Sequence, residues 1–357
     1  MKENKMERYA HGGDRYRNIV TEDFSININP LGMPKAVKQA IANCSAEMEY
    51  YPDPFCEQLA ERVAKKRGIS KENIIFGNGA SELIYTFIRA INPKKAWIPV
   101  PSFTEYERAL QACNTAIEFF PLSASDDFVM DHQLAHIIQS KEEEALPDII
   151  MICNPNNPNG RLVLPEVLKQ LVEICRERSI YLVVDECFLE LNGAFMQSAV
   201  RYMKDNPYLF VLDAFTKTYA MPGIRLGMGY SMNFNILKQM HIQMPQWNVS
   251  GIAQLAGIKA LEEAEYLESA ILILEEERKW LAKQLKQLGC YVFQSDANYI
   301  LFQSEKNWKK LLLEQGILIR DCQNYRGLQK GYYRVAVKTR EKNETLIKAM
   351  KQVLMEF

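Results

Sequence analysis

The sequence has 357 residues, which suits one large domain and a smaller one rather than a single small core. Its content of 48% hydrophobic and 24% charged residues is ordinary for a globular protein, and a net charge of −1 offers no field for nucleic acid or an anionic membrane surface. No apolar run approaches the roughly 18 residues of a spanning helix, and the N-terminus has no apolar core of the signal-peptide kind. We therefore expect a cytoplasmic protein.

The cysteines and histidines predict no metal site. The eight cysteines contain no C-x-x-C pair, so we expect mostly buried thiols of a reducing compartment. His132 and His136 have the spacing of helical ligands, but no third ligand accompanies them. A helix surface is the preferred interpretation of that pair.

Short apolar runs alternate with helical patterns over the first two thirds of the chain. The region 68–78 ends one helix and enters a strand, and residues 165–179 have a helical pattern. Further strands are predicted at 96–100, 148–153, 181–186, 209–214 and 225–231. Such alternation indicates an α/β fold with a mainly parallel sheet covered by helices on both faces.

The pattern changes beyond residue 250. Residues 261–289 predict one long helix, and an α+β tail follows, with strands at 291–295, 299–303 and 332–338. We predict a large domain at 46–255 and a small C-terminal domain at 256–357 that is entered by the long helix. The N-terminal segment 1–45 is assigned to the small domain.

Two loops are candidates for binding a phosphorylated ring. The stretch "GNGASELI" at 77–84 places two glycines and a serine just before a helical pattern, which aims backbone N–H groups at phosphate. The stretch "NPNNPNG" at 154–160 follows a buried strand and presents amides from a turn. Each stretch by itself is also compatible with ordinary turn chemistry.

Two strand ends carry charged candidates. Asp185 ends an apolar strand and needs a cationic partner if it is buried. Lys217 lies in "DAFTKTYAMPGIRLG" at 213–227, where desolvation would lower its pKa and make the amine a nucleophile. A surface lysine is the alternative. Because ligands of parallel sheets bind at the carboxyl ends of the strands, these loops and charges together fit an aromatic aldehyde phosphate cofactor.

The order "GNGASE", "NPNNPNG", "DECF" and "FTKTYAMPGIRLG" resembles the fold-type I pyridoxal-phosphate enzymes of the class I/II aminotransferase group, over nearly the whole chain. Within that group the chain is most similar to the threonine-phosphate decarboxylases of cobalamin biosynthesis. The segments that carry this likeness are "HGGD" (11–14), "DFSININPLGMP" (23–34), "PSFTEYERAL" (101–110), "ILIRDCQNYRGL" (317–328) and "YYRVAVK" (332–338). A second likeness, to histidinol-phosphate aminotransferases, includes "YPDP" at 51–54.

The resemblance implies roles for residues around the cofactor ring. Lys217 is expected to bond covalently to pyridoxal 5'-phosphate and then to transfer protons, and Asp185 to keep the pyridine nitrogen protonated. Asn157 would donate a hydrogen bond to the ring phenolate oxygen. Phe103 would stack on the ring, with a core aromatic as the alternative.

The resemblance also implies contacts to the cofactor phosphate. Ala80, Ser81 and Arg225 are expected to bind it. Many relatives carry Ser or Thr at the position of Ala214, so either Thr216 substitutes or the phosphate has one contact fewer.

A homodimer with composite sites is implied by Tyr51. This residue resembles the family's tyrosine that reaches the cofactor phosphate of the neighbouring subunit.

Substrate contacts are expected from the small domain and the N-terminal segment. By resemblance, Arg334 would bind the α-carboxylate, with Asn29 assisting. A phosphorylated substrate needs a second anion site, for which His11 and Arg320 are the candidates, with Arg161 ranked below Arg320. Each of these three could equally be a surface cation.

The predicted reaction is decarboxylation of L-threonine O-3-phosphate to 1-amino-2-propanol phosphate for cobalamin biosynthesis. Phe188 supports it by resemblance, since aminotransferases often carry tyrosine there. A histidinol-phosphate or related aminotransferase and a decarboxylase preferring serine phosphate remain alternatives, because one methyl group contributes only about 1–3 kcal/mol of discrimination. An inactive relative or the sensor domain of a regulator is the non-enzymatic alternative, and Lys217 favours an enzyme.

Overall fold

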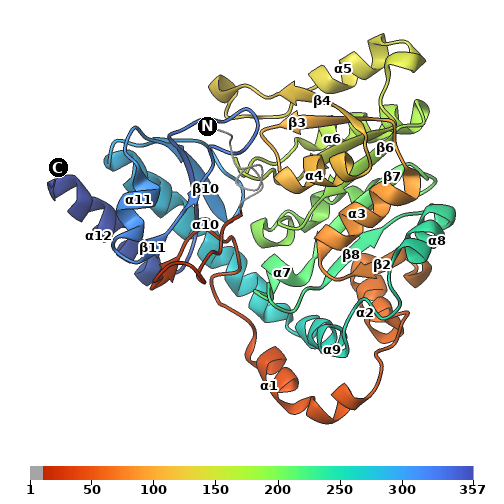
Figure 1. The fold of residues 1–357 in the computed structure, drawn as a ribbon, viewed down its shortest axis with the longest axis horizontal. Coiled ribbons are helices and arrows are strands. Elements are labelled where there is room, and N and C mark those ends of the chain that lie inside the picture. Colours follow the sequence, from red (N-terminus) through yellow and green to blue (C-terminus); the bar gives the residue numbers. More distant parts are fainter. Residues whose placement is uncertain (1–10, 357) are drawn as a thin grey trace.

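The computed structural model describes residues 11–356, which form a large sheet, a smaller sheet beside it and a separate pair of short strands (Figure 1). The larger sheet has seven strands, in the spatial order β2 (Ile74–Gly77), β8 (Gly227–Tyr230), β7 (Leu209–Ala214), β6 (Tyr181–Asp185), β5 (Ile149–Cys153), β3 (Lys95–Val100) and β4 (Ala116–Pro121). Neighbouring strands from β7 to β4 are parallel, and β8 is antiparallel to both of its neighbours. The carboxyl ends of the central strands therefore meet at one edge.

Helices cover both faces of this sheet because its strands are apolar on both sides. One core contains side chains from α2 (Glu57–Arg67), α5 (Gln133–Ser140), α6 (Pro165–Glu177) and α9 (Gly251–Ala260). The other core contains side chains from α3 (Ala80–Ile91), α4 (Thr104–Ala112) and α8 (Phe234–Gln243). Successive residues alternate between the two cores, as Ile152 and Cys153 do on β5.

The smaller sheet is antiparallel, in the order β12 (Arg320–Asp321), β13 (Tyr332–Ala336), β10 (Tyr299–Gln303) and β9 (Tyr291–Val292). Its core includes residues of α10 (Ala264–Gln287), α11 (Trp308–Leu313) and α12 (Arg340–Glu356). A parallel pair, β1 (Glu22–Asp23) with β11 (Ile317–Leu318), joins the N-terminal segment to this part of the chain.

The N-terminal segment is divided between the two cores. Phe24 is buried in the core of the smaller sheet, whereas Val37 of α1 (Lys35–Asn43) is buried in a core of the large sheet. The proposed domain limits, between residues 45 and 46 and between residues 255 and 256, stay a prediction. Residues 1–10 of the N-terminal segment lie outside the described part of the chain.

The α/β architecture predicted from the sequence is confirmed. The strand predicted at 225–231 is shorter in the structure, and β4 was missed because this edge strand is only partly buried and lacks a continuous apolar run. Within residues 11–356, no helix combines the length and apolar composition needed to span a bilayer.

Candidate active site

A cavity of about 350 Å³ opens at the carboxyl ends of β5, β6 and β7, beside the start of α3. This position is where open α/β sheets bind their ligands. The N-terminal segment, residues around β12 and β13, and residues in and beside α4 supply other parts of its wall. Both parts of the chain therefore contribute to one site.

Lys217 lies on the cavity wall in α7 (Phe215–Thr218), directly after β7. Burial, together with the positive charges of Arg334 and Arg225, lowers the pKa of Lys217 from 10.5 to about 8. Its Nζ lies 5.6 Å from the centroid of the Phe188 ring, which contributes to this poorly hydrated setting. The uncharged fraction of the amine near neutral pH is therefore much larger than that of an ordinary lysine, and this form is the nucleophile.

Asp185 lies on the same cavity and ends β6. The Tyr106 hydroxyl donates to its Oδ2 over 2.6 Å, and the backbone N–H of Cys187 donates to its Oδ1 over 3.0 Å. Burial raises the pKa of Asp185, while these two donors act in the opposite direction and stabilise its anion. The site thus presents a buried carboxylate that can hold a cationic ring nitrogen.

Asn157 lines the cavity from the turn after β5. Its Oδ1 accepts hydrogen bonds from Arg334 Nη1 and from the Tyr325 hydroxyl, the latter at 3.2 Å. With the oxygen occupied, the amide nitrogen is the group left to donate to a ligand. This arrangement suits a contact to an anionic ring oxygen.

The start of α3 lines another part of the cavity and has features that suit an anion. Gly79 has φ +81°, and a Cβ there would come within 2.4 Å of Arg225 Nη2, so only glycine allows the guanidinium this close to the helix start. Ala80 and Ser81 line the cavity at this helix start, where no side chain caps the free N–H groups. Thr216 and Ala214 both line the cavity, and the substitution of the Thr216 hydroxyl for a serine or threonine at position 214 stays a prediction.

A second cationic group lies on the wall formed by the N-terminal segment and the smaller sheet. His11, Arg320 and Arg334 line the cavity there, together with Arg108 of α4. Arg334 Nη2 donates to Ser25 O over 3.0 Å, and among residues 11–356 none accepts a hydrogen bond from its buried Nε. A buried donor of this kind is normally satisfied by a ligand or water.

Phe103 lines the cavity, and its ring lies 5.6 Å from the His11 ring. Three other predicted residues do not line it. The Asn29 amide donates to Thr218 O over 2.9 Å, Tyr51 is 79% exposed and stacks on Trp247, and Arg161 pairs with Asp296 over 3.3 Å. The assigned contacts of Asn29 and Tyr51 stay predictions. Arg161 is paired with Asp296 outside the cavity, so it is not part of the second cationic group.

Sequence reasoning missed Glu105, Tyr106 and Arg108 as individual site residues. All three lie on α4, directly after Phe103, within the segment whose resemblance was noted as a whole. The spacing of Glu105 and Arg108 places them on one helix face, where charges usually meet solvent. Nothing in the local pattern distinguishes them from a solvated pair.

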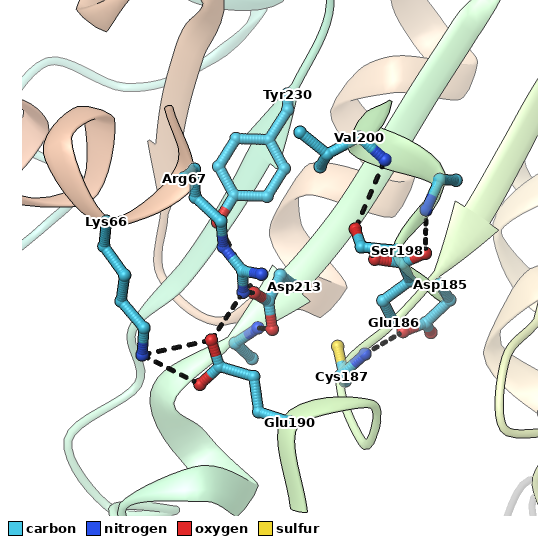
Figure 2. Close-up of polar contacts among 12 residues, drawn as sticks. Lys66, Arg67, Asp185, Glu186, Cys187, Glu190, Ser198, Val200, Asp213 and Tyr230 are labelled. Atoms are coloured by element: carbon cyan, nitrogen blue, oxygen red, sulfur yellow. Dashed lines mark hydrogen bonds and ion pairs between the residues drawn. The ribbon is translucent and has the colours of Figure 1, made fainter. Parts of the chain in front are cut away.

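A further charged cluster lies behind the strand ends, on the opposite face of the large sheet (Figure 2). Arg67 pairs with Asp213 and with Glu190, the latter at 2.8 Å, and Lys66 Nζ lies 3.1 Å from Glu190 Oε1. Burial raises the pKa of Glu186 in this cluster to about 8. The cluster joins α2 to the ends of β6 and β7 beneath the cavity.

Comparison with known proteins agrees with this geometry. The model of the family "Aminotransferase class I and II" matches residues 21–350. The chain is 36% identical to the threonine-phosphate decarboxylase of Salmonella typhimurium, over 97% of this chain and 96% of that protein. It is 32% identical to the adenosylcobalamin biosynthesis bifunctional protein CobDQ of Leptospira interrogans. That alignment covers 93% of this chain and 38% of the Leptospira protein.

Among solved structures, the histidinol-phosphate aminotransferase of Clostridium acetobutylicum superposes with a TM-score of 0.86 at 32% identity, covering 94% of this chain and 100% of that one. The match of the family model spans all the strands and every residue that lines the cavity except His11 and Gly12. The chain therefore belongs to the class I and II aminotransferase family, with the fold of the fold-type I enzymes and with pyridoxal phosphate as its cofactor.

Proposed function

We propose that this protein decarboxylates L-threonine O-3-phosphate to 1-amino-2-propanol phosphate for cobalamin biosynthesis. The observation that carries this proposal is the presence, in one cavity, of an anion site at the start of α3 and a separate cationic group around His11, Arg320 and Arg334. A phosphorylated amino acid bound beside a phosphorylated cofactor requires both. The similarity to the Salmonella enzyme and to CobDQ supports the choice of substrate and pathway.

The cavity residues fit pyridoxal phosphate at three points. The helix start with Arg225 suits its phosphate, Asp185 suits its ring nitrogen, and Lys217 has the lowered pKa that reaction with its aldehyde requires. When bound, the cofactor supplies an aldehyde for the substrate amine and a ring that accepts the electron pair released when CO2 leaves. Asn157 would donate to the ring oxygen, and Phe103 would pack on the ring face.

The substrate is held by the second cationic group in this proposal. Arg334 would bind the α-carboxylate, and its hydrogen bonds to Asn157 and Ser25 would hold the guanidinium in one orientation for this contact. Because the carboxylate leaves as neutral CO2, Arg334 contributes to binding and orientation more than to the stability of the transition state. His11 and Arg320 take the substrate phosphate.

Lys217 moves the proton that completes the reaction. Once CO2 has left, its Nζ delivers a proton to the substrate Cα, which becomes the amine-bearing carbon of the product. A lysine with a pKa of about 8 can hold this proton at neutral pH and release it readily.

A homodimer is part of the proposal. Tyr51 is 79% exposed and stacks on Trp247 with ring centroids 4.4 Å apart, so a large aromatic surface is available to a second copy of the chain. The contact of Tyr51 with the cofactor phosphate of the neighbouring subunit belongs to the same proposal.

A histidinol-phosphate aminotransferase is the second candidate, and the high structural similarity to the Clostridium enzyme favours it. Histidinol phosphate has no carboxylate, so it would leave Arg334 without its proposed partner. A decarboxylase preferring serine phosphate is a narrower variant of the main proposal.

One experiment separates these candidates. The holoenzyme is incubated with threonine phosphate, serine phosphate, or histidinol phosphate plus 2-oxoglutarate, and CO2 and glutamate are measured separately. We expect CO2 from threonine phosphate at the highest kcat/KM and no glutamate. Glutamate from histidinol phosphate without CO2 from either phosphorylated amino acid would refute decarboxylation.

A further inference from the structure

Residues 11–27, which we call the N-terminal strap, form part of the cavity wall. His11, Gly12, Ser25, Ile26 and Asn27 all line the cavity. The far end of the strap is fixed to β11 and to β13, because Phe24 N–H donates to Leu318 O over 2.7 Å and Ala336 N–H donates to Phe24 O over 2.9 Å. The near end, with His11, is held by different contacts.

Gly12 and Gly13 dock the near end of the strap on Ser25. A Cβ at Gly12 would lie 2.4 Å from Ser25 O, so the two backbones approach more closely than any other residue type allows. The N–H of Gly13, which has φ +89°, donates to Ser25 Oγ over 2.7 Å. Ser25 is itself fixed by Asp23, whose Oδ1 accepts from its hydroxyl over 2.6 Å. The two glycines therefore fix the backbone position of His11, which directly precedes them.

Glu105 fixes the imidazole of His11. Its Oε1 lies 2.9 Å from His11 Nε2 and 3.5 Å from Arg108 Nη1, and only 9% of its side chain is exposed. Burial acts to raise the pKa of Glu105, but the contacts with His11 and Arg108 outweigh it and keep this pKa below its ordinary value. Glu105 is thus a fixed anion that accepts a hydrogen bond from a residue 94 positions away.

The contact with Glu105 leaves one ring nitrogen of His11 free for a ligand. Nε2 is engaged, and within the described part of the chain no residue hydrogen-bonds Nδ1. The centroid of the His11 ring also lies 5.6 Å from that of the Phe103 ring, so the two rings are neighbours on the cavity wall. With Nε2–H directed to Glu105, Nδ1 donates to a phosphate oxygen when the ring carries both protons.

We propose that Glu105 is a positioning residue for the substrate phosphate. It acts through His11: the carboxylate and the Gly12–Ser25 contact together hold the imidazole on the cavity wall, so that Nδ1 meets a phosphate group bound near Arg320. Glu105 also lines the cavity, but its negative charge does not suit a direct contact with phosphate, so its role is to hold the imidazole. This inference rests on the proposed function, from which the phosphorylated substrate comes.

The test measures binding of inorganic phosphate to the holoenzyme, in which the cofactor already fills the anion site at the start of α3. His11→Ala, Glu105→Ala and Gly12→Ala should each weaken phosphate affinity by about tenfold or more, the loss expected for one charge-assisted hydrogen bond. Glu105→Gln keeps an oxygen that accepts from Nε2–H, so it should stay within about threefold of the unmodified enzyme. The matched control is Asp14→Ala, since this strap carboxylate pairs with Arg17 and should leave phosphate affinity unchanged.

Cofactor absorbance and thermal unfolding show that each variant is folded and loaded. The protein has four histidines, so the imidazole NMR signal that is lost in His11→Ala identifies His11. Phosphate should move this signal in the unmodified enzyme and much less in Gly12→Ala, which retains every side chain of the site. Unchanged phosphate affinity in Glu105→Ala and Gly12→Ala would overturn the proposal, as would equal losses in Glu105→Gln and Glu105→Ala.

Failure of the proposed function has a different signature. If the unmodified holoenzyme released no CO2 from threonine phosphate, the decarboxylase assignment would fail. The dependence of phosphate binding on His11, Glu105 and Gly12 would still decide the positioning role, because that measurement requires no turnover.

Discussion

The hydroxyl of Tyr106 donates a hydrogen bond of 2.6 Å to the buried carboxylate of Asp185. Tyr106 is fully buried in α4, and burial together with the negative charge of Asp185 raises its pKa well above the ordinary value, so its hydroxyl keeps the proton. The helix that carries Glu105 to the rim of the cavity therefore also supports the carboxylate at its base. One helix, through two consecutive residues, therefore contributes to both the substrate end and the cofactor end of the site.

Tyr106→Phe should weaken cofactor binding. The change leaves Asp185 with one donor fewer while it must remain ionised opposite the ring nitrogen, a loss of about 1–3 kcal/mol, or roughly tenfold or more in cofactor affinity. Titration of the apoprotein with pyridoxal phosphate measures it. Tyr333→Phe is the matched control, because the Tyr333 hydroxyl donates to Lys306 O outside the cavity. Equal cofactor affinity in the two variants would show that the Tyr106 hydroxyl does not stabilise the Asp185 carboxylate.

The rate at which apoprotein recaptures pyridoxal phosphate should rise with pH through about 8. Only the neutral amine of Lys217 attacks the aldehyde, and its pKa is lowered to about 8, so the reactive fraction increases up to this pH and levels off about one unit above it. The visible absorbance of the lysine-bound cofactor reports the reaction, and Lys217→Ala should never develop it. A midpoint near the 10.5 of an ordinary lysine would contradict the desolvated setting.

Arg334→Ala should discriminate between substrate and product. Threonine phosphate has an α-carboxylate and 1-amino-2-propanol phosphate has none, so the variant should lose about 3–5 kcal/mol of affinity for the first and little for the second. Competition binding to the holoenzyme measures both ligands, and retained absorbance shows that the cofactor stays bound. Parallel losses for the two ligands would mean that Arg334 acts through Asn157 or Ser25 rather than on the carboxylate.

The positions of Asp185 and Lys217 could be predicted because buried parallel strands are continuous apolar runs. A charge that ends such a run must lie at the carboxyl edge of the sheet, where the cavity is found. The same rule does not predict which residues form the walls of the site. His11 and Glu105 are 94 positions apart, and neither has a local pattern that indicates the other.

Arg334 shows a second limit of sequence reasoning. Its resemblance to a carboxylate-binding arginine came from a motif, but its contacts with Asn157 and Ser25 depend on how the smaller sheet meets the turn after β5. The contact of Asn29 with Thr218 is of the same kind, since a buried asparagine can serve either a ligand or a neighbouring backbone. Such choices follow from tertiary packing and not from residue type.

The cluster behind the cavity joins carboxylates of two kinds (Figure 2). Glu190 is paired with Lys66 and Arg67, whereas Glu186 accepts hydrogen bonds from the Ser198 hydroxyl over 2.5 Å and from the Ala199 N–H over 2.6 Å. Burial raises the pKa of Glu186 from 4.5 to about 8, and nearby hydrogen bonds and Arg67 only partly oppose this. Glu186 therefore carries a proton in the folded protein at neutral pH.

Protonated Glu186 makes the stability of the protein depend on pH. Because its pKa is higher in the folded than in the unfolded state, its stabilising contribution is fully present below about pH 4.5 and is lost as the pH rises through about 8. Glu186→Gln mimics the protonated acid and cannot ionise. The variant should unfold at about the same temperature as the unmodified protein at pH 5 and at a higher temperature at pH 9, where its free energy of unfolding should be larger by on the order of a few kcal/mol.

Glu190→Gln is the comparison that identifies the cause. It removes the ion pairs with half-buried Lys66 and with the buried guanidinium of Arg67, so it should destabilise the protein by about 3–5 kcal/mol at pH 7. Thermal unfolding from pH 5 to pH 9 measures both variants under the same conditions. If the difference between Glu186→Gln and the unmodified protein did not change with pH, the proton would not reside on Glu186, and the excess negative charge of the cluster would have to be neutralised at another carboxylate.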